Sequence, residues 1–243
     1  YHTNANENAI KEIFSGKSVS RNVIQKSEIK GINRIITQRG PNTLVFNREL
    51  LHYYPVINLS VNHKFARRGD LLWVLFNQIV SEHKIVEHTF SIQQNRTISK
   101  FDLHRELEKS AYDIIGYAFN KGFLNTIQKI KTETNPNRPK DIFEKLETEI
   151  YFDFFLNTYK RFLQGRKTKF LMNYYRIIGL LEILSNDFEN AKIISNQISK
   201  TNELNVFLSL MTSAESEETL KDFINELTTD IWTYSNAVTS VSE

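Results

Sequence analysis

The sequence contains no cysteine. Disulfide bonds, thiolate metal sites and cysteine nucleophiles are therefore excluded, and a small secreted domain held by disulfides is not expected. Glycine and proline are also scarce, with 8 and 4 residues among 243. Because turn-rich β proteins use many of both, this scarcity favours long helices. No apolar run reaches the ~18 residues that a membrane-spanning helix requires, so we expect no membrane span.

The charged residues are unevenly distributed, although the net charge is only +3. Residues 1–70 contain eleven Lys and Arg against five Asp and Glu, and residues 71–181 contain seventeen against twelve. Residues 182–243 reverse this balance, with three basic and eleven acidic side chains. Clustered cations attract phosphates independently of sequence, so the first two thirds of the chain favour an anionic partner. Ordinary solvated helix faces explain the same pattern without a partner.

The segment 111–130 has the apolar spacing of a helical hairpin. Apolar residues recur every three or four positions, as on one face of a helix, at Ala111, Ile114, Ile115, Ala118 and Phe119. We expect Lys121-Gly122 to end this helix, because glycine adopts the left-handed conformation that closes helices. A second apolar stripe then predicts a helix that folds back on the first, with Phe123, Ile127 and Ile130 facing it.

The same design returns toward the C-terminus. Apolar stripes at 174–184 and 188–198 are separated by residues 185–187, and those at 204–211 and 220–227 by residues 213–216. A further helix is expected to begin at Ile231. The pattern returns after about 29 residues, as from Ile177 to Val206, and a period of about 20 to 50 residues indicates a repeat array. The predicted fold class is therefore all-α, an array of helical hairpins (an α-solenoid) with irregular insertions.

Several of these segments resemble pentatricopeptide repeats, the helical hairpins of organellar RNA-binding proteins. In that family a first helix opens with Thr-Tyr-Asn, a Lys-x-Gly or Gly-Asp break follows, and the second helix carries Leu-Phe. The matching pieces here are Val45-Phe46-Asn47, Arg68-Gly69-Asp70 with Leu75-Phe76, Ala111-Tyr112-Asp113, Asn120-Lys121-Gly122 and Thr233-Tyr234-Ser235. The resemblance implies a non-catalytic, RNA-associated protein of the mitochondrial matrix. It would bind organellar mRNA or ribosomal RNA, including as a subunit of the mitochondrial ribosome.

Four sections divide the chain. Residues 1–40 are expected to form an N-terminal extension with short helices, and residues 41–133 a first helical-repeat section. Within that section, residues 84–99 keep no helical stripe, so any strand is expected in this irregular insertion. Residues 134–140 place two prolines in a polar run and form a linker, because a helix does not cross such a run. Residues 141–243 form a second helical-repeat section.

The strongest basic patch lies at the expected join between two helical units. It contains no acid and six cations: Lys160, Arg161, Arg166, Lys167, Lys169 and Arg176. A smaller cluster consists of Lys64, Arg67 and Arg68. Cations beside aromatic rings hold single-stranded RNA through phosphate contacts and base stacking, so these nine residues are the predicted RNA-binding candidates. The phenylalanines near the main patch are expected in the core instead.

No catalytic or metal-binding motif is complete, so we expect neither enzyme activity nor a cofactor. Ser15-Gly16-Lys17-Ser18 resembles the end of a nucleotide-binding loop, but Lys11 stands where that motif needs its first glycine. His83 and His88 are five positions apart and do not share a helix face as zinc ligands would.

A second function stays open beside RNA association. A helical-repeat scaffold could bind other proteins without touching RNA, and the acidic segment 182–243 suits that role equally well. The two functions differ in their salt dependence, because phosphate contacts weaken steeply as salt rises whereas apolar contacts do not. The sequence begins with tyrosine rather than methionine, and we expect that an N-terminal segment has been removed.

Overall fold

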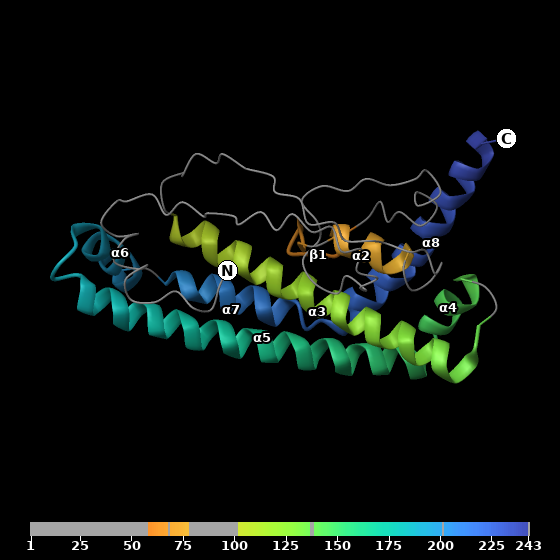
Figure 1. Cartoon of the computed structure of the whole chain (residues 1–243), viewed down its shortest axis with the longest axis horizontal. Helices are drawn as coiled ribbons and strands as arrows, with labels where there is room; N and C mark the ends of the chain where they lie inside the picture. The colour runs from red at the N-terminus through yellow and green to blue at the C-terminus, as the bar shows by residue number, and fades with distance from the viewer. Residues whose placement is uncertain (1–57, 68, 78–101, 137–138, 201, 243) are drawn as a thin grey trace, which may run out of the picture.

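The computed structural model describes residues 58–67, 69–77, 102–136, 139–200 and 202–242. Within these ranges the chain forms seven helices and one two-stranded antiparallel hairpin (Figure 1). This confirms that the described part of the chain is mainly helical. The expectations for the N-terminal extension 1–40 and for the insertion 84–99 lie outside the described residues.

Two long antiparallel helices form the centre of the molecule. α3 spans Leu103–Thr134 and α5 spans Glu149–Leu184, and the two pack side by side along most of their length (Figure 1). Asp102 caps α3, its carboxylate accepting the backbone amide of Arg105 at 3.2 Å. These helices are far longer than the hairpin units that the sequence pattern indicates.

A short helix connects the two long ones. α4 spans Pro139–Leu146, and a proline suits its first position because the first turn of a helix needs no amide donor from that residue. α3 ends at Thr134, so the break predicted at residues 134–140 is present between these helices.

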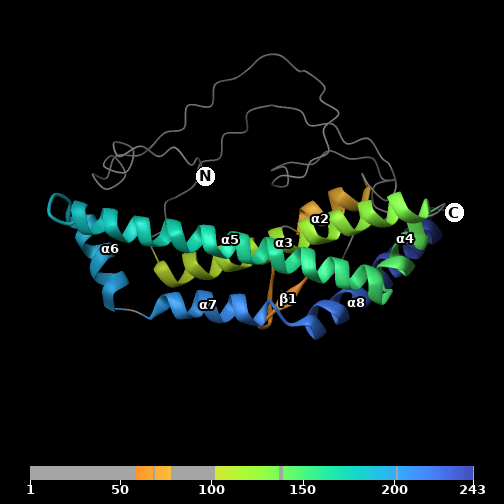
Figure 2. The ribbon, with the colours of Figure 1, turned by 90° about the horizontal axis from the view of Figure 1, so that it is seen from below.

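Three helices complete the chain. α6 spans Glu189–Lys200, α7 spans Glu203–Ser213 and α8 spans Glu217–Ser242. α6 turns the chain at the end of α5, and α7 and α8 then run back beneath the long pair (Figure 2). The helix breaks predicted at 185–187 and 213–216 are both confirmed.

The new helix predicted at Ile231 is wrong, because α8 continues through that residue without interruption. Ile231 is fully buried, and the neighbouring Trp232 meets Phe143 of α4 edge to face with ring centroids 5.8 Å apart. The apolar residues here extend the buried face of α8 and do not start a new unit.

The helix break predicted at Lys121-Gly122 is also wrong, because α3 runs through it. A Cβ at Gly122 would lie 3.2 Å from both Phe155 Cε2 and Tyr159 Cβ of α5. The glycine therefore serves close helix packing and not helix termination. The predicted apolar face itself is confirmed, since all of its members are buried: Ala111, Ile114, Ile115, Ala118, Phe119, Phe123, Ile127 and Ile130.

One main core joins residues on both sides of the 134–140 linker. Its largest fully buried side chains come from nearly every described helix and include Phe76, Phe123, Phe143, Phe155, Tyr159 and Phe207. A separate small core between the end of α5 and α6 consists of Leu181, Leu184 and Ala191. Ile177 lies in the stripe predicted at 174–184 but is 53% exposed, so that stripe is buried only at its C-terminal end.

A β-hairpin and a short helix dock on α3. β1, Ser60–Val61, pairs with β2, Lys64–Phe65, through a turn in which Asn62 and His63 have φ values of 50° and 62°. Positive φ at both central residues matches the twist of a tight hairpin. α2 spans Gly69–Leu75 and follows the hairpin directly in the chain.

The hairpin is held by Tyr112 of α3. Its hydroxyl donates to the Val61 carbonyl at 3.0 Å, and its own carbonyl accepts the Arg67 amide at 3.2 Å. The Arg67 carbonyl then lies against Gly116, where a Cβ would be only 1.8 Å away. Gly116 is therefore required because the loop backbone occupies the space of a side chain.

Candidate nucleic-acid interface

The main basic patch lies in the middle of α5 and not at a join between helical units. α5 is continuous from Glu149 to Leu184, and it carries no acidic residue between Asp153 and Glu182. A continuous helix advances about 100° and 1.5 Å per residue, so its register decides which of the six cations share a face.

Four cations form what we call the outer strip: Arg161, Arg166, Lys169 and Arg176. All four side chains are exposed. Helical register places Arg161, Lys169 and Arg176 within about 80° of one another, over about 22 Å of helix length. Arg166 lies on the side of this strip that faces α3.

Arg166 links the strip to α3 through an aromatic ring. Its guanidinium carbon is 4.0 Å from the ring centroid of Tyr117, and Lys121 Nζ is 5.9 Å from the same centroid. A cation near a ring face is attracted by about 0.5 to 1 kcal/mol at an exposed site. Tyr117 thus holds one cation from each long helix at the seam between them.

Phe162 extends this arrangement along α5. Its ring meets Tyr117 edge to face with centroids 6.1 Å apart, and the Arg161 guanidinium lies 5.3 Å from its centroid. Two half-buried rings therefore position two arginines of the outer strip. With the four cations of the outer strip, Lys121 makes a fifth cation in this region. The sequence does not predict it as a candidate, because Lys121-Gly122 has the pattern of a helix end.

Lys160 and Lys167 belong to another side of α5. They are seven residues apart and half-buried, and helical register places Gln164 between them on the same side. Gln164 donates a hydrogen bond to the Glu215 carboxylate at the turn between α7 and α8. These two lysines therefore lie toward an acidic turn, and the structure separates them from the outer strip.

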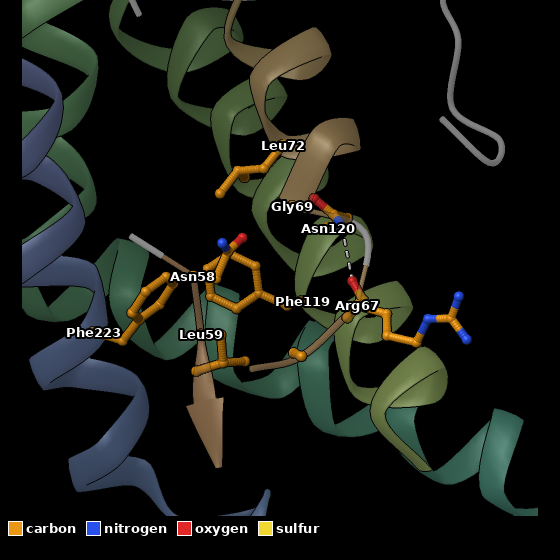
Figure 3. Close-up of a pocket in the computed structure, with 10 residues that line it drawn as sticks. Asn58, Leu59, Arg67, Gly69, Leu72, Phe119, Asn120 and Phe223 are labelled. Atoms are coloured by element: carbon orange, nitrogen blue, oxygen red, sulfur yellow. Dashed lines mark hydrogen bonds between the residues drawn. The ribbon is translucent and has the colours of Figure 1, made fainter. Parts of the chain in front are cut away.

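The smaller basic cluster is not part of the strip either. Lys64 Nζ donates to Glu108 of α3 at 2.5 Å, and this hydrogen bond raises the lysine pKa above its ordinary value. The Arg67 backbone docks on α3 while its side chain extends away from the helix (Figure 3). Arg68 lies outside the described residues.

The outer strip differs from several lysines of α3 and α4 in its lack of acidic partners. Lysines on α3 and α4 form ion pairs within their own helices: Lys109 with Glu106, Lys129 with Glu133 and Lys140 with Glu144. Among the described residues, no carboxylate pairs with a cation of the outer strip. Cations without protein counter-charges bind solution anions, which a polyanion displaces on association.

A pocket between the hairpin, α2, α3 and α8 does not compete as a ligand site (Figure 3). It is lined by Leu59, Gly116, Phe119 and Phe223 among others, and its cavity volume is about 20 Å³. Ligand pockets usually enclose about 300 to 1,000 Å³. This cavity has room for about one water molecule.

The described residues contain no group of three or more His, Asp or Glu side chains placed to hold a metal ion. None of their helices combines the length and the apolar character needed to cross a bilayer. Comparison of the chain with protein-family models, curated proteins and solved structures finds no match.

Proposed function

We propose that the protein is a non-catalytic RNA-associated protein that binds phosphates through the outer strip of α5. The observation that carries this proposal is the placement of exposed cations without acidic partners in the described structure: Arg161, Lys169 and Arg176 share one face of a rigid helix, and Arg166 lies beside them at the seam with α3. Such a surface attracts a polyanion without reading its sequence. Lys121 of α3, which shares the Tyr117 ring with Arg166, adds one more positive charge beside the strip.

The biological setting in this proposal comes from the resemblance to pentatricopeptide repeats. It assigns the protein to gene expression in the mitochondrial matrix, with organellar mRNA or ribosomal RNA as the ligand. Membership of the mitochondrial ribosome, with other ribosomal subunits as partners, is one form of the same proposal.

A repeat array enters the proposal only for the C-terminal part of the chain. The small core between α5 and α6 is separate from the main core, as expected where successive hairpins each bury their own faces. We propose that α6 to α8 and the end of α5 form a short hairpin array attached to the long α3–α5 pair.

The proposal is tested by neutralising the four cations of the strip and comparing the result with a control variant of the same net charge. One variant replaces Arg161, Arg166, Lys169 and Arg176 by Gln. The control variant replaces four exposed lysines on other elements or faces, namely Lys109, Lys140, Lys145 and Lys192. Both variants lose the same charge. Fluorescence anisotropy with a labelled RNA should show affinity falling about 10- to 100-fold for the strip variant alone. Equal losses in both variants would mean that net charge, and not this surface, binds RNA.

A protein-binding scaffold is the second candidate, and one observation favours it. Met172, Tyr175 and Ile183 are 52%, 61% and 68% exposed near the C-terminal end of α5, within about 80° of one another by helical register. Exposed apolar side chains gathered on one helix face are typical of protein contacts. Binding through this face would change little with salt, in contrast to binding through the strip.

A further inference from the structure

The aromatic rings beside the outer strip are already occupied. The Tyr117 ring holds the Arg166 guanidinium at 4.0 Å, and the Phe162 ring holds that of Arg161 at 5.3 Å. Farther along α5, Phe170 stacks on Phe207 of α7 with ring centroids 4.3 Å apart. Base stacking on any of these three rings would first require the displacement of a cation or of a core side chain.

Sequence-tolerant binding of a single strand depends on such rings. A flexible strand loses conformational freedom when it is ordered on a protein, and stacking of unpaired bases on aromatic side chains offsets this loss. The three rings named above do not offer the outer strip such platforms, and Tyr175, beside Arg176, is the one exposed ring next to it among the described residues. A nucleic acid whose backbone is already ordered therefore suits this surface better.

The shape of the strip also favours a nucleic acid whose backbone is already ordered. Its cations lie along about 22 Å of one continuous helix, whose other side is packed into the main core through Phe155, Tyr159 and Leu163. The array is therefore rigid and convex. It cannot wrap around a strand, but it can lie against a fixed row of phosphates.

From these observations we infer that the ligand of the outer strip is double-stranded RNA, recognised through its phosphates, and not an unpaired strand. This inference rests on the proposed function, since it names the class of RNA that the same site takes. Two features support it beyond ring occupancy. A duplex has a higher charge density than a single strand, and double-stranded B-DNA releases about 0.9 counterions per phosphate contact against about 0.7 for a single strand. Duplex RNA is also recognised mainly by shape and backbone contacts.

Tyr175 is the one ring that allows a direct test of stacking. It is 61% exposed and adjoins Arg176, and its only ring contact among the described residues is an edge-to-face one with Tyr174 at 5.8 Å. If unpaired bases bound here, this ring would be their platform. Replacing it by leucine keeps an apolar side chain but removes the stacking face.

The experiment compares one unstructured RNA strand of about 20 nucleotides, free or paired with its complement, by fluorescence anisotropy at equal salt. That length slightly exceeds the ~16 base pairs that a double-stranded-RNA domain contacts. We expect the duplex to bind about tenfold more tightly than the free strand, and Tyr175→Leu to change neither affinity.

Equal or tighter binding of the free strand, or a weaker free-strand affinity in Tyr175→Leu, would overturn this inference while leaving RNA association intact. Failure of the intact protein to bind either RNA would overturn the proposed function and the inference together. Binding of the duplex that survives replacement of Arg161, Lys169 and Arg176 by Gln would show that the duplex binds elsewhere, and would also overturn the assignment.

Discussion

Gly122 of α3 lies directly against Tyr159 of α5, so that a Cβ on the glycine would be 3.2 Å from the tyrosine Cβ. The Tyr159 hydroxyl continues across the core and donates to the Ala214 carbonyl at 2.8 Å, at the turn between α7 and α8. One fully buried side chain thus connects α3, α5 and the returning C-terminal helices. This contact fixes the part of α5 from which the outer strip projects.

Two Gly→Ala substitutions should change the stability of the protein in opposite directions, because one glycine is in close contact with the backbone and the other is not. Gly116→Ala should destabilise the protein, because its Cβ would lie 1.8 Å from the Arg67 carbonyl oxygen. Gly165→Ala is the matched control, since nothing lies within 4 Å of its Cβ position in α5. That change should stabilise by about 0.5 to 1 kcal/mol through helix propensity. Urea unfolding measures both, and stabilisation by Gly116→Ala would contradict the docked loop.

Truncation of a core residue should cost far more than truncation of an exposed one. Ile115 is fully buried in α3, whereas Ile177 of α5 is 53% exposed. Ile115→Ala should lower the free energy of unfolding by about 2 to 5 kcal/mol, the range for buried large-to-small changes. Ile177→Ala should lower it by about 0.5 kcal/mol or less. Similar losses for the two variants would mean that Ile115 is not buried in the main core.

Alkaline pH should destabilise the fold through Tyr159. Burial raises the pKa of its phenol above the ordinary value, and the negative charge of Glu215 adds to this rise. The unfolded chain therefore loses this proton first, at about pH 10, and binds fewer protons than the folded chain above that pH. The free energy of unfolding should fall as pH rises above about 10.

The control for this prediction is Tyr159→Phe, which removes the titrating hydroxyl. Loss of the hydrogen bond to Ala214 should lower its stability by about 1 kcal/mol at neutral pH. Its further loss between about pH 8 and pH 10.5 should nevertheless be smaller than in the parent, as followed by urea unfolding. An identical alkaline loss in parent and variant would assign the effect to other groups, such as Tyr112, whose pKa is also raised by burial.

Much of the fold could be predicted from local apolar spacing. All eight residues predicted for the buried face of α3 are buried, although Leu107, Tyr112 and Leu124 of the same helix are also buried and were not predicted. The breaks that end α5 and α7 were predicted because polar residues interrupt the apolar stripes there. The error at Gly122 came from reading one glycine as a helix end. The spacing from Phe119 through Phe123 to Ile127 stays helical across it, and this continuity was the better signal.

The arrangement of the candidate site was beyond sequence reasoning. The run of cations in 160–176 is visible as a local pattern, but its division into two sides follows only once α5 is known to be one helix. The contact between Arg166 and Tyr117 joins residues 49 positions apart on different helices. Such a pairing depends on the register of α3 against α5, which no local spacing determines.

The most direct test of the account is the salt dependence of RNA binding. The logarithm of the association constant is plotted against the logarithm of salt concentration for the parent, the four-residue strip variant and its charge-matched control. Four phosphate contacts predict that the parent and the control share a slope steeper than that of the strip variant by about three to four units. Parallel lines for the parent and the strip variant would contradict the claim that Arg161, Arg166, Lys169 and Arg176 bind RNA phosphates.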